Sequence, residues 1–163
     1  MNERALMQEK TFLSVAEILA SEGRYIGGFQ GKSMRPMLRD DRDSVLILPI
    51  TRPYRKYDVL LYRSPKPGRL VMHRVVKVKP DGGIVIRGDN CYFNEYHVTP
   101  DRVVGILGGY YKGRDPKMRS LDAPSYRLYA WWRVLNYPLR RIFYYPVYTL
   151  LRRIYHTVFR RKK

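Results

Sequence analysis

The stretch 30–36, QGKSMRP, places Ser33 after a glycine and before a proline. A serine hydroxyl is a weak nucleophile at neutral pH and needs a neighbouring base to take its proton. The chain has three histidines, and His73 is the one that interrupts an apolar, strand-like run, LVMHRVVKV. Ser33 and His73 are therefore a candidate nucleophile and general base. The alternative interpretation is an ordinary turn serine and a structural strand histidine.

A carboxylate that could assist this pair follows at Asp89, in the sequence RGDN at a predicted strand end. A carboxylate there could hold the tautomer of the His73 imidazole and stabilise its protonated form. GDN alone is a common turn signal. The set therefore has chemical meaning only if the fold brings Ser33, His73 and Asp89 together.

The elements that must position these residues begin with a predicted amphipathic helix over residues 1–22. Its apolar residues Phe12, Val15, Ala16 and Leu19 recur at three-and-four spacing, and Gly23 is a plausible end of the helix. We expect this helix to pack on its own domain, with a partner-binding helix as the alternative.

Short strands are predicted next, within a domain over residues 23–115. They are rich in β-branched residues and are separated by Pro, Gly and Asp clusters. The predicted strands cover residues 44–50, 58–63, 70–78, 83–87 and 103–111. Because no helices are predicted between them, the pattern favours a mostly β domain, a compact antiparallel barrel-like or sandwich arrangement.

Five short motifs occur along this domain in a fixed order. They are SMRP at 33–36, YDVLLY at 57–62, HRVV at 73–76, GDN at 88–90 and RVVG at 102–105. In this respect the chain resembles the signal peptidase and LexA-type serine peptidase superfamily, over roughly residues 31–105. Bacterial signal peptidases have lysine where this chain has His73, whereas the endoplasmic-reticulum type has histidine. The resemblance implies a mostly β catalytic domain that cleaves peptide bonds.

The resemblance also implies a role for each site residue. Ser33 would be the nucleophile, and His73 would be the general base and then the general acid toward the leaving amine. Asp89 would be the orienting carboxylate, with Glu95 and Asp101 as substitutes. The oxyanion would be held by backbone N–H groups of residues near the serine, namely Gly31, Lys32, Ser33 and Met34. No metal or cofactor is implied, and the partner would be a peptide or protein substrate.

The chain departs from the family pattern at several positions. Gly31 stands where signal peptidases usually carry a second serine, and the resulting G-x-S-M is closer to the LexA branch. Tyr57 replaces the usual glycine before Asp58, and Met37 replaces the usual threonine after the proline. A catalytically inactive homologue that binds peptides in a groove is therefore the alternative hypothesis.

The segment 116–163 has a different composition and is predicted to form a basic helical extension. Beyond Asp122 it contains no acidic residue, and Pro138 and Pro146 each suit the first turn of a helix. In the last predicted helix the apolar residues fall on one face, while Arg152, Arg153, His156 and Arg160 fall on the other. This pattern is typical of a helix that lies in a membrane interface.

The net charge of +18 indicates an anionic partner. We expect contact with an anionic membrane surface, where each basic side chain contributes on the order of 1 kcal/mol and where Trp and Tyr also favour the interface. The candidate contact residues are Trp131, Trp132, Arg140, Arg141, Arg152, Arg153 and Arg160. The alternatives are an extension packed over the domain with a solvated basic face and, less favoured, nucleic-acid binding.

Two further features concern the cellular compartment. The N-terminal stretch has no uncharged apolar run typical of a signal peptide, and no uncharged run reaches the length of about 18 residues that spans a bilayer. We therefore expect a cytoplasmic protein, peripheral on the inner face of the cell membrane. Cys91 is the single cysteine, and we expect a small buried residue there rather than a reactive thiol.

Overall fold

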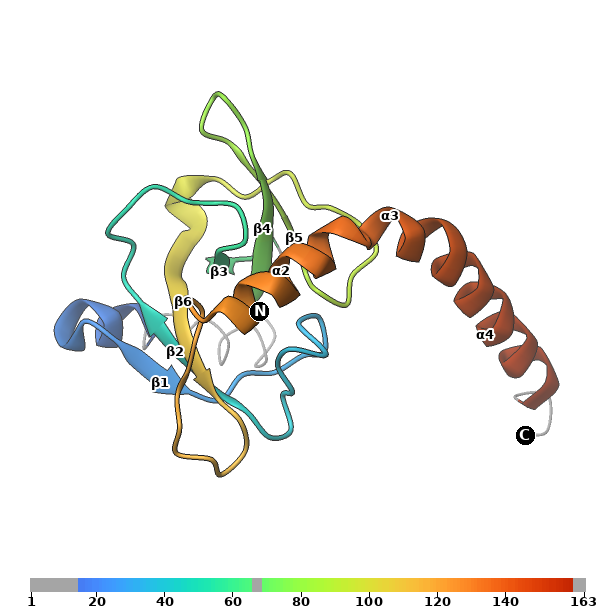
Figure 1. Cartoon of the computed structure of the whole chain (residues 1–163), viewed down its shortest axis with the longest axis horizontal. Helices are drawn as coiled ribbons and strands as arrows, with labels where there is room; N and C mark the ends of the chain where they lie inside the picture. The colour runs from blue at the N-terminus through green and yellow to red at the C-terminus, as the bar shows by residue number, and fades with distance from the viewer. Residues whose placement is uncertain (1–14, 66–68, 160–163) are drawn as a thin grey trace, which may run out of the picture.

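The computed structural model describes residues 15–65 and 69–159. Within these residues, seven strands form one antiparallel sheet in the order β1-β2-β6-β3-β4-β5, with β7 paired to β6 (Figure 1). The strands are β1 (Tyr25–Gly27), β2 (Ser44–Leu48), β3 (Val59–Arg63), β4 (Leu70–Val78), β5 (Ile84–Arg87), β6 (Val103–Tyr111) and β7 (Arg119–Ser120).

The mostly β fold expected from the sequence is thus confirmed, and the five predicted strands form at nearly their predicted bounds. The barrel-like closure is not confirmed. Among the described strands, β1 and β5 are the two ends of the strand order and do not pair with each other. β6 occupies the middle of the sheet, where it pairs with both β2 and β3.

Apolar side chains are buried on both faces of the sheet, because successive residues of a strand point to opposite faces. In β3, Val59 and Leu61 contact one core cluster, while Leu60 and Tyr62 belong to another. The first cluster also contains residues of the loop that follows β1 and of the helix Pro124–Leu135, and the second contains residues of β4 and β5. The site described below is positioned by both clusters.

Residues 15–22 form a helix that packs on the domain, as expected. Val15 and Leu19 are buried in the first core cluster. The helix ends at Gly23, which has a φ of +66° and donates its N–H to the Leu19 carbonyl at 3.1 Å. Glycine is favoured in this left-handed conformation because it has no Cβ. Residues 1–14 of the predicted helix lie outside the described residues.

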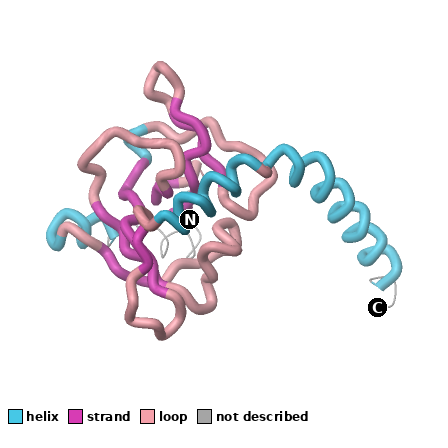
Figure 2. Tube along the Cα trace, in the orientation of Figure 1, coloured by secondary structure: helices cyan, strands magenta, loops and turns pink. Residues whose placement is uncertain are grey.

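The C-terminal arm consists of α2 (Pro124–Leu135), α3 (Tyr137–Leu139), a π-helical turn (Arg140–Tyr144) and α4 (Tyr145–Phe159). Figures 1 and 2 show α2 across the sheet and α4 leading away from it. Tyr126 and Ala130 of α2 are buried in the first core cluster, whereas the large apolar side chains described on α4 from Val147 to Tyr155 are exposed. None of the helices that the structure describes is long and apolar enough to cross a bilayer.

Candidate active site

His73 lies in β4 with its imidazole buried and only 5% of the residue exposed. Its Nδ1 atom is 2.8 Å from Oε1 of Glu95 and 3.0 Å from the Tyr62 hydroxyl. Tyr62 itself donates its hydroxyl proton to Oε2 of Glu95 at 2.8 Å. In the neutral imidazole these contacts favour the tautomer with the proton on Nδ1, which places the lone pair on Nε2, on the side of the Cys91 thiol.

The sheet register brings these three residues together. His73 pairs with Leu60 of β3, so Tyr62, two residues further along β3, lies on a neighbouring strand close to the imidazole. Glu95 follows β5 and is held against it by two main-chain hydrogen bonds with Ile86, at 2.8 and 3.0 Å. The orientation of His73 is therefore set by β3, β4 and the segment after β5.

Gly88 packs against the Nε2 side of the imidazole. A Cβ atom at this position would lie 2.7 Å from the Ser33 carbonyl oxygen, 2.8 Å from Sγ of Cys91 and 2.9 Å from Nε2 of His73. Real Cβ contacts are not this short, so only glycine fits here without a shift. The same observation shows that Ser33, Cys91 and His73 surround one point, although the sequence separates them widely.

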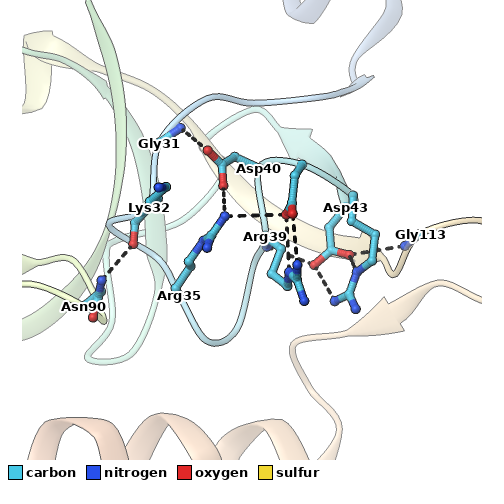
Figure 3. Close-up of polar contacts among 10 residues, drawn as sticks. Gly31, Lys32, Arg35, Arg39, Asp40, Asp43, Asn90 and Gly113 are labelled. Carbon is cyan, nitrogen blue, oxygen red and sulfur yellow. Dashed lines mark hydrogen bonds and ion pairs between the residues drawn. The ribbon is translucent and has the colours of Figure 1, made fainter.

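The segment 88–90 is bonded directly to the serine loop. The Asn90 N–H donates to the Ser33 carbonyl at 2.7 Å. The Asn90 side chain donates to the Lys32 carbonyl at 3.3 Å (Figure 3). Among the hydrogen bonds of the described residues, none joins the Ser33 hydroxyl to His73. The structure therefore places the serine backbone beside the histidine and leaves the hydroxyl without that bond.

A network of charged side chains holds the loop that carries Ser33 (Figure 3). The carboxylate of Asp40 accepts from the Gly31 N–H at 3.2 Å and from Arg35 at 2.7 Å. The hydrogen bond from Arg35 lowers the pKa of Asp40 below its ordinary value. Gly31 has a φ of +113°, a conformation that favours glycine. The buried Asp43 accepts from the Gly113 N–H and so attaches the far end of this loop to the strand region after β6.

The four backbone N–H groups expected to hold an oxyanion are not equivalent. The Gly31 N–H is already bonded to Asp40. Within the described part of the chain, the N–H groups of Lys32, Ser33 and Met34 have no intramolecular acceptor. Three of the four predicted donors thus have no bond within the described residues, although Met34 itself is buried.

The structure does not bring Asp89 to His73, although the sequence suggested it as the orienting carboxylate. Asp89 accepts two hydrogen bonds from Arg74, at 2.7 and 2.8 Å, and one from the Tyr129 hydroxyl at 2.9 Å. The guanidinium fork of Arg74 matches a carboxylate in bidentate geometry, which gives it an advantage over a single imidazole N–H. Asp89 therefore connects β4 to α2.

Asp101, the other residue suggested as a substitute for Asp89, lies in the 3-10 helix Pro100–Arg102.

The main-chain oxygen of Asp89 makes further bonds to the C-terminal arm. Arg133 and Arg140 both donate to it, the latter at 2.8 Å. Arg140 also lies over the ring of Tyr92. Arg140 was expected to contact membrane, but it is half-buried and its guanidinium donates a hydrogen bond to the domain.

The electrostatics of the His73–Glu95 pair favour the charged forms of both groups. Burial lowers the pKa of His73, but the hydrogen bonds and charges of Cys91 and Glu95 outweigh burial and raise it to about 9. Burial raises the pKa of Glu95, but the hydrogen bond and charge of His73 prevail and lower it. Burial and the hydrogen bond to Glu95 raise the pKa of Tyr62, which therefore remains a proton donor.

Cys91 is a site residue that the sequence reasoning missed. It is partly buried rather than fully buried, and its Sγ faces the same point as Nε2 of His73. The Cys91 N–H donates to the Gly88 carbonyl at 2.9 Å, which closes a turn and directs the thiol back toward the imidazole. The position of the cysteine directly after the GDN turn was the signal available in the sequence.

Most of the remaining membrane-contact candidates lie on exposed parts of the arm. Trp131, Trp132, Arg141, Arg152 and Arg153 are exposed, and Arg141 lies over the ring of Phe93. Arg160 lies outside the described residues.

Among the described residues, no cluster of three or more His, Cys, Asp or Glu residues could hold a metal ion.

Comparison with known proteins found no match, whether to a protein-family model, to a curated protein or to a solved structure.

Proposed function

We propose that this chain is a serine endopeptidase resembling signal peptidase, with Ser33 as nucleophile and His73 as general base. The observation that carries the proposal is the convergence at Gly88 of the Ser33 backbone and Nε2 of His73. The hydrogen bond from His73 Nδ1 to Glu95 gives this base an orienting carboxylate at its other nitrogen. Nucleophilic catalysis requires a base oriented in this way together with a serine hydroxyl within its reach.

In this mechanism a rotation of the Ser33 side chain brings its hydroxyl to Nε2 of His73. The imidazole takes the hydroxyl proton as the oxygen attacks the carbonyl carbon of the scissile peptide bond. Glu95 stabilises the imidazolium that forms, and the amine leaves with the proton that His73 returns. A water molecule then attacks the acyl-enzyme with His73 again as base, which releases the acid product and regenerates Ser33.

The negative oxygen of the tetrahedral intermediate would be bound by the N–H groups of Lys32, Ser33 and Met34. These groups lack an intramolecular acceptor among the described residues. Loss of one oxyanion donor typically costs about 3 kcal/mol in the barrier. The Gly31 N–H contributes indirectly, because its bond to Asp40 fixes the start of the loop.

We also propose that the C-terminal arm holds the enzyme on an anionic membrane surface, which would be the inner face of the cell membrane for a cytoplasmic protein. Leu139, Ile142, Phe143, Val147 and Leu151 are all exposed large apolar residues of the arm. No acidic residue follows Asp122, so the arm combines apolar and basic surface without negative charge. These are the properties of a helix that lies in a bilayer interface.

A catalytically inactive peptide-binding homologue is the second candidate. Two observations favour it: the Ser33 hydroxyl has no hydrogen bond to His73 among the described residues, and the pKa of His73 is raised to about 9. An imidazole that is protonated at neutral pH cannot accept the serine proton. Such a homologue would bind extended peptides at the site without cleaving them. Nucleic-acid binding by the basic arm is the third and least favoured candidate.

The deciding experiment incubates the purified protein with a peptide mixture and anionic vesicles and identifies the products by mass spectrometry. The proposal expects cleavage by the wild type and by Ser21→Ala, a control at an exposed serine of the N-terminal helix, and none by Ser33→Ala. Thermal unfolding should be nearly the same for all three proteins. Equal cleavage by Ser33→Ala would overturn the catalytic assignment, and peptide binding without turnover in the wild type would favour the inactive homologue.

A further inference from the structure

A cleft of about 560 Å³ lies between β4 and β5 on one side and α2 and α3 on the other. Its lining includes three lysines, an arginine and several aromatic rings, and the described residues that line it include no Asp or Glu. The residues that matter here are Lys56, Lys77, Lys79, Arg87, Trp131 and Tyr137. A concave site with convergent cations and apolar walls is suited to an anionic ligand that also has an apolar part.

The cleft is separate from the candidate active site. Arg87 of β5 pairs with Arg74 of β4, while Ile86 pairs with Val75. Directly opposed residues share a face and successive residues alternate, so Arg87 lies on the face of Arg74. Val75 and His73 belong to the other face. The cleft therefore opens on the side of the sheet that α2 covers.

Arg87 is the distinctive residue of the cleft, because it is only 5% exposed and carries no ion pair within the described chain. Its guanidinium donates one hydrogen bond to Oδ1 of Asn94 at 2.9 Å and lies 3.5 Å from the ring centre of Tyr137. A guanidinium has five N–H donors, so these two neutral partners leave both charge and donors for a further ligand. Burying a cation without an anion is costly.

The neighbouring charges add to the uncompensated positive charge of Arg87. Arg133 and Arg140 approach from the arm, and the carboxylate of Asp89 is occupied by Arg74. Burial lowers the pKa of Arg87, and the charge of Arg140 lowers it further, against the opposing effects of Tyr137 and Asp89. An anion bound in the cleft would offset this excess of positive charge.

We propose that the cleft binds the phosphate of an anionic phospholipid headgroup, with Arg87 as its central ligand. Arginine suits phosphate because its planar fork can donate two parallel hydrogen bonds to the phosphate oxygens. Trp131 and Leu135 line the cleft and are exposed, so they join it to the apolar surface of the arm. This inference rests on the proposed membrane contact of the arm and adds a specific lipid site to it.

The test titrates the purified full-length chain with a short-chain phosphatidylglycerol below its micelle concentration, followed by calorimetry. No bilayer is present, so the measurement reports the cleft and not the docking of the arm. We expect saturable binding that weakens by at least about tenfold in Arg87→Met, the loss typical of one charge-assisted hydrogen bond. Lys77→Gln should weaken binding less, and it serves as the second variant if Arg87→Met does not fold. Arg114→Gln, at an exposed residue of the β6–β7 connection, should bind like the wild type.

Equal affinity of the wild type, Arg87→Met and Lys77→Gln would overturn the proposal. A parallel titration with inorganic phosphate distinguishes the source of the phosphate. If inorganic phosphate binds as tightly as the lipid, the cleft serves a free phosphate compound and the lipid assignment is wrong. Vesicle sedimentation tests the docking of the arm, and peptide cleavage tests catalysis. Because these are separate assays, each proposal can fail without affecting the result for the others.

Discussion

Oε1 of Glu95 lies 2.8 Å from Nδ1 of His73, whereas both carboxylate oxygens of Asp89 are bonded to Arg74. The two acidic residues follow β5 within the same short segment, yet the structure gives them different partners. Glu95 contacts the imidazole of His73, whereas Asp89 joins β4 to α2 through Arg74 and Tyr129. This difference leads to the first prediction.

Glu95→Gln should lower kcat by on the order of 10²- to 10⁴-fold, because it removes the carboxylate that orients and stabilises the imidazole. At pH 9.5, where His73 is mostly neutral, its stability should change little. Asp89→Asn should instead lower the free energy of unfolding by about 3–5 kcal/mol, because it leaves Arg74 buried without its anion. Steady-state kinetics and urea unfolding of both variants check this. The assignment of Glu95 as the orienting carboxylate would be contradicted if only Asp89→Asn lost activity and if it did so without losing stability.

The rate of the proposed peptidase reaction should rise with pH from neutrality up to about pH 9. His73 acts as a base only when neutral, and its pKa is raised to about 9, so each pH unit below that value should lower kcat about tenfold. In Glu95→Gln the acidic limb should shift to lower pH, since one cause of the raised pKa is removed. The pH profile of kcat gives the acidic limb of the wild type and of Glu95→Gln. An acidic limb near pH 6.5 in the wild type would show that the pKa of His73 is not raised.

The same pKa shift has a consequence for stability that a catalytically inactive protein would share. The pKa of His73 is about 9 in the folded chain and about 6.5 in an unfolded one. Protonation therefore stabilises the fold fully below pH 6.5, and this contribution is lost as the pH rises through 9. Urea unfolding should show that the wild type loses more stability between pH 6 and pH 9.5 than His73→Gln, which is the control. An equal loss in both proteins would contradict the pKa shift.

Gly88→Ala should abolish cleavage and lower the free energy of unfolding by about 1–3 kcal/mol. The added methyl group would meet the Ser33 carbonyl, the Cys91 thiol and the His73 ring, all closer than 3 Å, and overpacking of this kind costs about that much. Gly28→Ala is the matched control, because a Cβ there would meet nothing within 4 Å. Thermal unfolding and the peptide assay should separate the two variants, and full activity of Gly88→Ala would argue against this packing.

The strands could be predicted from sequence because their β-branched runs are local and bounded by turn residues. The run 70–78 forms β4 at its predicted bounds. The choice between Glu95 and Asp89 could not be predicted, because it depends on Arg74, whose side chain lies on the opposite face of β4 from the His73 imidazole. The position of Arg87 in the cleft could not be predicted either, since the cleft forms only when α2 packs against the sheet. Local patterns thus predicted the strands, while long-range packing determined the partners.

A thiol-directed alkylating reagent should abolish the proposed peptidase activity of the wild type but not that of Cys91→Ala. Cys91 is partly exposed and faces the position between Ser33 and His73, so an added group would block the approach of the serine hydroxyl. Cys91→Ala should itself retain activity, because the proposed nucleophile is the serine. Loss of cleavage in Cys91→Ala, with normal folding, would instead indicate that the thiol is the nucleophile.

The most direct test of the central claim is covalent labelling with a fluorophosphonate, which reacts with serines that a neighbouring base activates. The wild-type protein at pH 9 should be labelled at Ser33, as identified by mass spectrometry of its peptides. Labelling should be strongly reduced in His73→Gln and unchanged in Ser21→Ala. Equal labelling of Ser33 in the wild type and His73→Gln, or no labelling of Ser33 in a folded wild-type protein, would contradict the account.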